Sequence, residues 1–307
     1  MVSEPTISIK RALVTGGTGI VGTPLVSTLT GSGVDVTVLV RSAQAADSPT
    51  TDVRYLIGDI SENAFIETLE NEKFDVVFNV AAAVHGSAKD RAVFFKINVN
   101  GVENVVAYCQ RTSTRLVHVS TVNVDSYRRG VLKDHYSESK SLAEEVIDTA
   151  VQNGLDAVIV RPATVFGSEP GRAGLLVERV LNGSLKVLPA PRRVISPVWA
   201  GDLANALVSA ATHGGQGQTY TVAGPATDTR SFIRTVANLT GNRVPLVGVP
   251  ATLVALPLFL LGILSPITRW TPPVTAKGVL SDSIHDGRQA ADELGFSYSD
   301  LSEIFSR

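Results

Sequence analysis

Cysteine is almost absent from this sequence, because Cys109 is the only one among 307 residues. One thiol cannot form an internal disulfide, so we expect the chain to fold in a reducing compartment, and the cytoplasm is the predicted location. Cys109 falls in an apolar helical pattern, where burial as a small hydrophobic side chain is the expected role.

Charged residues are also scarce, at 18% of the chain, and the formal net charge is -2 without any Lys/Arg-rich run. No positive field attracts nucleic acid, so a nucleic-acid partner is not expected. The five histidines are scattered without the spacing of metal ligands, and no metal site is predicted. A G-x-S-x-G sequence is missing too, which argues against the nucleophile elbow of the α/β-hydrolases.

No apolar run in the chain is long enough to cross a membrane. The strongest candidate, LVALPLFLLGIL at 253–264, is shorter than the roughly 20 residues required and is interrupted by Pro257. We expect a buried helix or the lipophilic wall of a substrate pocket there, with weak peripheral membrane contact as the alternative. Residues 1–10 lack the apolar core of a signal peptide, so no signal peptide is expected.

Short apolar runs alternate with longer amphipathic stretches over the first half of the chain. Strands buried on both faces read as continuous apolar runs, and strand–helix alternation of this kind indicates a parallel sheet. The pattern therefore predicts an α/β fold with a doubly wound, Rossmann-type parallel sheet. Strands are expected at 12–15, 34–40, 53–57, 75–80, 116–120, 157–160 and 219–222, and helices at 19–29, 64–69, 93–110 and 139–153.

The pattern loosens after Pro162, where Gly, Pro and Arg accumulate from 167 to 193. We expect a cofactor-binding Rossmann domain over 1–166, to which 194–223 returns. A smaller, interleaved substrate-binding region is expected to comprise 167–193 and 224–307.

A glycine-rich loop, TGGTGIVG at 15–22, joins the first predicted strand to the first helix. In a dinucleotide-binding loop, Gly16 permits the tight turn, Gly19 lets the backbone approach the pyrophosphate, and Gly22 lets the helix pack closely on the sheet. The helix N-terminus then offers N–H groups and a positive dipole end to the phosphates. Thr18 and Ile20, between these glycines, are predicted cofactor contacts as well.

The end of the second predicted strand bears on the choice between NAD and NADP. An acidic residue there binds the ribose 2′-hydroxyl, whereas an arginine pairs with a 2′-phosphate. Val40 and then Arg41 stand at this point, while Asp35 lies at the wrong end of the strand. The sequence therefore favours NADP(H), with Arg41 as the clamp and Ser42 as a possible second contact; NAD(H) remains possible.

A tyrosine and a lysine four residues apart, Tyr136 and Lys140, would share one face of a helix. A free phenol has a pKa near 10, and a nearby ammonium would lower it enough for acid–base work near neutral pH. Ser120 and Thr121 end the fifth predicted strand just upstream, where a hydroxyl can hold a substrate oxygen against Tyr136. These residues predict acid–base chemistry at a carbinol or carbonyl carbon.

Taken together, the motifs resemble those of the extended short-chain dehydrogenase/reductases, the NAD-dependent epimerase/dehydratase superfamily, from about residue 12 to 305. Within it, the pattern is most similar to dihydroflavonol-reductase-like and 3-beta-hydroxysteroid-dehydrogenase-like members. The resemblance is carried by TGGTGIVG at 15–22, GDI at 58–60, NVAAA at 79–83, NVNGVENVV at 98–106, VST at 119–121, YSESK at 136–140, RPATVFG at 161–167 and PVWAGDLANAL at 197–207.

The resemblance implies roles for individual residues. Thr121, Tyr136 and Lys140 would be catalytic, and Asn98 would brace the active site unless it is only a helix cap. Cofactor contacts are implied for Asp59, Ile60, Ala81, Ala82, Ala83, Tyr136, Lys140, Pro162 and Val165, and substrate contacts for Val84, His85 and Thr164. A homodimer through the helices at 93–110 and 139–153 is a further expectation from the family.

Three functional classes remain open within such a superfamily, because a fold does not settle a function. Nucleotide-sugar epimerases and dehydratases usually carry an asparagine where Thr164 stands and an arginine where Ile195 stands, seven residues before Asp202. We therefore expect an NADP(H)-dependent oxidoreductase that acts on a carbonyl or alcohol of a fairly hydrophobic small molecule. A sugar epimerase or dehydratase with tightly bound NAD is the alternative, and a non-catalytic dinucleotide-binding regulator is the third.

Overall fold

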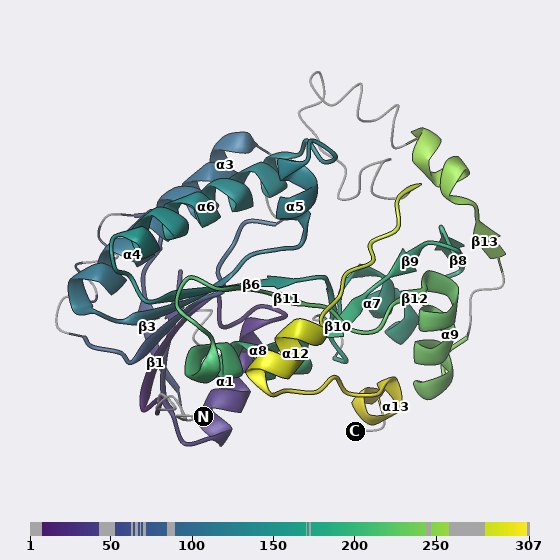
Figure 1. Cartoon of the computed structure of the whole chain (residues 1–307). Coiled ribbons are helices and arrows are strands. Elements are labelled where there is room, and N and C mark those ends of the chain that lie inside the picture. Colours follow the sequence, from purple (N-terminus) through teal and green to yellow (C-terminus); the bar gives the residue numbers. More distant parts are fainter. Residues whose placement is uncertain are drawn as a thin grey trace.

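Seven parallel strands form the central sheet of the molecule, in the order β11-β6-β5-β4-β1-β2-β3 (Figure 1). The computed structural model describes residues 8–42, 53–62, 64, 67, 69, 72–84, 90–169, 171, 173–243, 247–257 and 280–305. The strands of the sheet are β1 (Arg11–Thr15), β2 (Asp35–Val40), β3 (Val53–Ile57), β4 (Val76–Asn79), β5 (Arg115–Val119), β6 (Ala157–Pro162) and β11 (Thr219–Val222). The predicted doubly wound, Rossmann-type sheet is confirmed.

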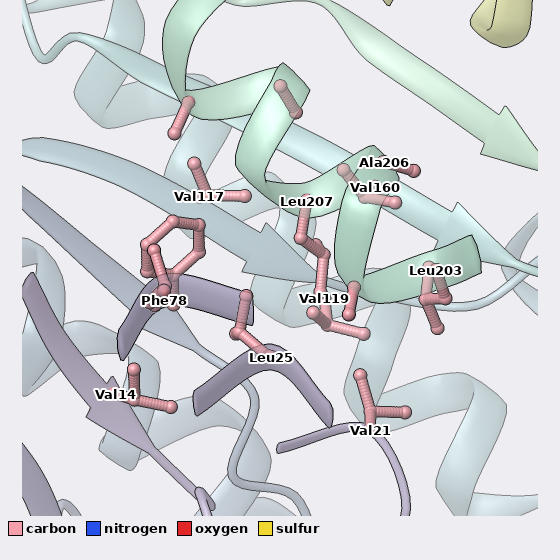
Figure 2. Close-up of a cluster of buried hydrophobic side chains, with 14 of the residues drawn as sticks. Val14, Val21, Leu25, Phe78, Val117, Val119, Val160, Leu203, Ala206 and Leu207 are labelled. Atoms are coloured by element: carbon pink, nitrogen blue, oxygen red, sulfur yellow. The ribbon is translucent and has the colours of Figure 1, made fainter. Parts of the chain in front are cut away.

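Helices cover both faces of this sheet, which is why its strands are apolar on both sides. On one face, α1 (Gly22–Gly31) and α8 (Ala200–His213) contribute to a cluster of buried aliphatic side chains that includes Leu25 and Leu207 (Figure 2). On the other face, α4 (Gly101–Thr112) and α6 (His135–Gln152) contribute to a second buried cluster.

The helix α12 (Arg288–Leu294) belongs to the first of these faces (Figure 1). Its residues Ala290 and Leu294 are buried in the same cluster as α1 and α8. The Tyr298 hydroxyl accepts a hydrogen bond from the Ala223 amide just after β11 and donates one to the Gly287 carbonyl before α12. The sequence analysis assigned all of 224–307 to the substrate-binding region, and within that range apolar packing returns α12 to the main sheet.

The single helix predicted over 93–110 is divided in three. It begins as α3 (Arg91–Phe95), passes through η2 (Lys96–Asn100), a π-helical turn, and continues as α4. A π-helical turn adds one residue to the backbone ring and is frequent at functional sites. This turn contains Asn98, which is buried.

Three helices and several short strands form a smaller region with its own buried cluster, on the right in Figure 1. Its helices are α7 (Leu175–Leu181), α9 (Thr229–Leu239) and α13 (Leu301–Phe305). Its two-stranded sheets pair β7 (Thr164–Phe166) with β10 (Pro197–Trp199), β8 (Val187–Pro189) with β13 (Val247–Val249), and β9 (Val194–Ile195) with β12 (Thr227–Asp228). The assignment of this region to substrate binding stays a prediction.

Parts of the sequence-based interpretation lie outside the described residues. These are half of the helix predicted at 64–69, the apolar tract from 258 to 264, and the substrate contact His85. Among the helices that the structure does describe, none combines the length and apolarity needed to cross a bilayer.

Candidate active site

The loop after β1 and the segment after β4 meet where the strand order reverses, with β2 on one side of β1 and β4 on the other. In open α/β sheets, ligands bind in the crevice at such a switch point, beyond the carboxyl ends of the strands. Gly16 has φ +70°, and a Cβ at this position would lie 2.7 Å from the Ala81 nitrogen. Only glycine lets the two segments approach so closely.

The close contacts that require the other glycines of the loop differ from the predicted ones. A Cβ on Gly22 would overlap the Gly16 carbonyl oxygen and lie 2.6 Å from the Gly17 Cα, so Gly22 keeps the loop itself compact. Gly17, which the sequence analysis did not single out, is the residue that faces the sheet, since its Cβ would lie 2.7 Å from Val38 Cγ1 on β2.

The outer part of the same loop fits a diphosphate. Thr18 and Gly19 are exposed, and a Cβ on Gly19 would meet only the Gly16 carbonyl oxygen, at an ordinary 3.5 Å. No side chain caps the N-terminus of α1, which follows directly. Backbone N–H groups at an uncapped helix N-terminus, together with the helix dipole, favour a bound anion.

Arg41 and Ser42 are exposed immediately after β2, at the carboxyl edge of the sheet. Asp35 lies at the opposite end of β2, where it forms an ion pair with Arg11 at 3.4 Å. The carboxylate of Asp35 is therefore remote from the ribose position, as expected, and Arg41 is the positively charged side chain beside the end of β2.

The two residues predicted to contact adenine, Asp59 and Ile60, are not equally available. The Asp59 carboxylate accepts hydrogen bonds from the amide and hydroxyl of Ser61. Ile60 is buried in the core, and its carbonyl accepts a hydrogen bond from Asn104 at 2.7 Å. The Ile60 side chain therefore packs inside the protein instead of facing the ligand edge.

Tyr136 and Thr121 are brought together at the carboxyl edge of β5. Tyr136 lies in the first turn of α6, which begins four residues before the predicted start because Asp134 caps it by accepting from the Ser137 amide at 2.9 Å. Phe94 packs edge-on against the tyrosine ring, with ring centroids 6.3 Å apart. Thr121 forms a side-chain hydrogen bond with Tyr136.

The electrostatics of this tyrosine differ from the prediction. Burial raises the pKa of Tyr136 to about 12, although the hydrogen bond from Thr121 opposes the rise. The Lys140 ammonium donates to the Val119 carbonyl at 2.7 Å and lies 3.1 Å from His118 Nε2. The expected lowering of the Tyr136 pKa by Lys140 is therefore not found, because the lysine is turned toward β5.

Lys140 itself is almost fully buried. Burial lowers its pKa to about 8, and the carboxylate of Glu144, one helical turn along α6, opposes this decrease. Desolvation of an ammonium disfavours its charged form, which is the direction seen here.

Asn98 connects the segment after β4 to α6. Its Oδ1 accepts from the Ala83 amide at 2.8 Å, and its Nδ2 donates to the Ala83 carbonyl at 3.0 Å and to Ser139 Oγ at 2.9 Å. Ser139 in turn donates to the Tyr136 carbonyl at 2.8 Å. Asn98 thus fixes the segment that contains Ala81, Ala82 and Ala83 relative to the first turn of α6, as a brace and not as a helix cap.

The remaining predicted site residues lie around the ends of β4, β5 and β6. Ser120 is buried, and its hydroxyl finds no hydrogen-bond partner among the described residues, whereas Thr121 bonds to Tyr136. Pro162 is buried and its carbonyl accepts from the Val122 amide. The exposed Thr164, the half-buried Val165 and the exposed Val84 lie in β7 or directly after β4.

An ion-pair network around the buried carboxylate of Glu144 holds α5 (Asn123–Arg128) and α6 against β6. Glu144 of α6 accepts from Arg161 Nε at 2.8 Å and pairs with Arg128 at 3.1 Å. Arg161 also donates to Asp125 at 2.7 Å. Because α5 directly follows Thr121, this network fixes the backbone on which the Thr121 hydroxyl depends. Sequence patterns carry no signal for this network, since its members are distant along the chain.

Sequence analysis also missed three polar residues beneath the site, Thr15, Asn79 and His118. All three are fully buried in the sheet. Over the described part of the chain, no group of His, Cys, Asp and Glu side chains is arranged to hold a metal ion.

Residues 12–223 match the model of the NAD dependent epimerase/dehydratase family. The chain belongs to this family. Family members of the extended short-chain dehydrogenase/reductase type are NAD(P)-dependent enzymes. The prediction that the chain is an enzyme and the prediction of its superfamily are both confirmed.

Two curated relatives of this epimerase/dehydratase-family chain are reductases by name. The putative dihydroflavonol 4-reductase of Synechocystis sp. is 28% identical, over 95% of this chain and 92% of the relative. The 4-hydroxy-2-methyl-3-oxo-4-farnesyl-3,4-dihydroquinoline-1-oxide ketoreductase of Stigmatella aurantiaca is 28% identical, over 78% of this chain and 76% of the relative. Among solved structures, gox2253 shares the fold with a TM-score of 0.79 at 20% identity, over 97% of this chain and 96% of its own.

Proposed function

We propose that this family member is an NADP(H)-dependent oxidoreductase that reduces a carbonyl group, or oxidises the matching alcohol, on a fairly hydrophobic small molecule. The observation that carries the proposal is the hydrogen-bonded pair of Thr121 and Tyr136 at the carboxyl edge of β5, on the same edge of the sheet as the glycine-rich loop after β1. Two hydroxyl groups at this place can hold one substrate oxygen between them.

The protonation of Tyr136 supports action as an acid. Because its pKa is raised to about 12, the phenol keeps its proton at neutral pH. NADPH, when bound, would supply a hydride to the substrate carbon. Tyr136 then gives its proton to the oxygen that gains negative charge, while the Thr121 hydroxyl keeps that oxygen in place.

The choice of NADP(H) rests on the exposed guanidinium of Arg41 at the end of β2. A carboxylate at this position would repel a 2′-phosphate, and the nearest one on the strand, Asp35, lies at its other end. Arginine matches a phosphate with two parallel hydrogen bonds, which favours the phosphorylated cofactor.

A nucleotide-sugar substrate has less support. Ile195, at the position where sugar epimerases usually carry an arginine, is buried, and it forms a β-bridge with Ser283. Thr164 stands where their asparagine would bind a diphosphate. By contrast, one ketoreductase relative acts, by its name, on a farnesyl-bearing dihydroquinoline oxide, which supports a lipophilic ketone as the substrate class. The homodimer and the cytoplasmic location stay predictions.

The test replaces Tyr136 with phenylalanine. Purified protein is supplied with NADPH and a panel of aromatic and alicyclic ketones and aldehydes, and NADPH consumption is followed by absorbance. Loss of a general acid costs about 10²–10⁴-fold in rate, so we expect kcat for Tyr136→Phe to fall by that factor while the affinity for NADPH is retained. Tyr55→Phe on β3, at the far edge of the sheet from Thr121, is the matched control. Normal turnover by Tyr136→Phe would overturn the assignment.

A further inference from the structure

Four buried polar side chains form a continuous chain across the sheet beneath the proposed active site. The Thr15 hydroxyl on β1 lies 2.7 Å from Asn79 Oδ1 on β4, and Asn79 Nδ2 lies 3.1 Å from His118 Nδ1 on β5. His118 Nε2 lies 3.1 Å from Lys140 Nζ on α6. At the other end, the Ala81 amide donates to Thr15 Oγ1 at 3.2 Å. The chain thus joins the lysine to the segment after β4.

The imidazole at the centre of this chain is neutral. Burial, and after it the charge of Lys140, keep the pKa of His118 well below its usual range. A neutral imidazole carries one proton, so one ring nitrogen donates a hydrogen bond and the other accepts one. The two ends of an asparagine amide have the same shape, and either end of Asn79 can face the ring. Two arrangements of the chain therefore give both nitrogens of the His118 ring a partner.

In the first arrangement, Lys140 is an uncharged amine. Thr15 donates to Asn79 Oδ1, Asn79 Nδ2 donates to His118 Nδ1, and His118 donates from Nε2 to the lone pair of Lys140. Lys140 still donates to the Val119 carbonyl. Every buried donor and acceptor along the chain has a partner, which buried polar groups require.

In the second arrangement, Lys140 is an ammonium and has only donors. His118 Nε2 must then accept, so the ring proton resides on Nδ1 and needs an acceptor. Asn79 supplies that acceptor when its amide is rotated to turn Oδ1 toward the ring. Its Nδ2 then donates to Thr15 Oγ1, which also accepts from Ala81, and the Thr15 hydroxyl no longer donates to Asn79. One proton is taken up in total, and the histidine stays neutral in both arrangements.

We propose that His118 is a positioning residue that changes tautomer when Lys140 takes up a proton, so that the charge state of the lysine is passed through Asn79 to the Thr15 hydroxyl on β1. The histidine sets where the lysine ammonium is held, and the lysine in turn sets which end of Asn79 faces β1. The catalytic use of this coupling rests on the proposed function, whereas the coupling itself does not.

The charged groups around Lys140 bear on the pH at which the conversion is expected. Glu144 on α6 favours the ammonium, and it is itself paired with Arg161 on β6 and Arg128 on α5. His118 is the titratable group that faces Lys140 from β5. The conversion is therefore expected close to the Lys140 pKa of about 8.

The experiment is nuclear magnetic resonance of the full chain, with histidine rings labelled with nitrogen-15 and lysine labelled with carbon-13. The pH is varied between about 6 and 10, which brackets the Lys140 pKa of about 8. We expect the His118 ring proton on Nε2 at the alkaline end and on Nδ1 at the acidic end. The change of tautomer should have the same midpoint as the change in the Lys140 Cε chemical shift. His213, exposed on α8, is the internal control and should not follow Lys140. In Lys140→Met, His118 should keep one tautomer throughout.

A single His118 tautomer across the whole Lys140 titration, or a doubly protonated His118 ring, would overturn the proposal. A tautomer change that persists in Lys140→Met would overturn it as well. The outcome is independent of the proposed function: if Tyr136→Phe keeps its activity while the tautomer changes as expected, the oxidoreductase assignment fails and the coupling stands.

Discussion

At the scale of single residues, the protonation states of Tyr136 and Lys140 suit reduction better than oxidation. The tyrosine keeps its proton at neutral pH, because burial raises its pKa to about 12, and it is ready to donate. The lysine, with a pKa of about 8, carries its charge at neutral pH and loses it in mildly alkaline solution. Oxidation of an alcohol needs a base instead, so we expect the reductive direction to dominate at neutral pH.

Arg41 provides a prediction about cofactor choice. Its guanidinium would donate charge-assisted hydrogen bonds to the 2′-phosphate, and the loss of such bonds costs about 1.5–3 kcal/mol, or roughly 10- to 100-fold in affinity. We expect Arg41→Ala to weaken NADPH binding by that factor and to leave NADH binding unchanged, as measured by calorimetric titration. Arg234→Ala, which removes a charge from the exposed face of α9, should alter neither. Tighter binding of NADH than of NADPH by the wild-type protein would contradict the Arg41 assignment.

At the scale of elements, α6 presents Tyr136 and Lys140 only if it is held against β6 and α5. Glu144→Gln keeps the side-chain volume but leaves the guanidinium of Arg161 without its buried carboxylate. Removal of one partner of a buried ion pair costs about 3–5 kcal/mol. We expect the free energy of unfolding, measured with urea, to decrease by about that amount. Glu145→Gln, on the exposed side of the same helix, is the control, and an equal effect of both changes would contradict the role of the network.

The elements also show how far sequence patterns reach. The seven strands and the Tyr136–Lys140 spacing were predictable, because apolar runs and local spacing are properties of neighbouring residues. The π-helical turn at Asn98 was not, since its stability depends on hydrogen bonds to Ala83 and Ser139, which are distant in the sequence. The orientation of Lys140 was not predictable for the same reason, because tertiary contacts direct its ammonium to Val119 and His118.

At the scale of the whole molecule, the chain returns to its first domain more than once. After the smaller region, α8 and β11 rejoin the main sheet, and α12 then packs on the same face as α1 (Figure 1). The smaller region is thus connected to the sheet at several points along the chain. Unfolding of the sheet and detachment of α12 are therefore expected to be one cooperative event.

Leu294 tests this cooperativity, because it is buried among side chains of the main sheet although it lies close to the C-terminus. Leucine-to-alanine changes in a core cost about 2–5 kcal/mol. We expect Leu294→Ala to lower the free energy of unfolding of the entire protein by that amount, in a single thermal transition. Leu175→Ala, at an exposed leucine of α7, should have little effect. If α12 instead belonged to a separate unit, Leu294→Ala would split the transition and leave the melting of the sheet, and NADPH binding, at their wild-type values.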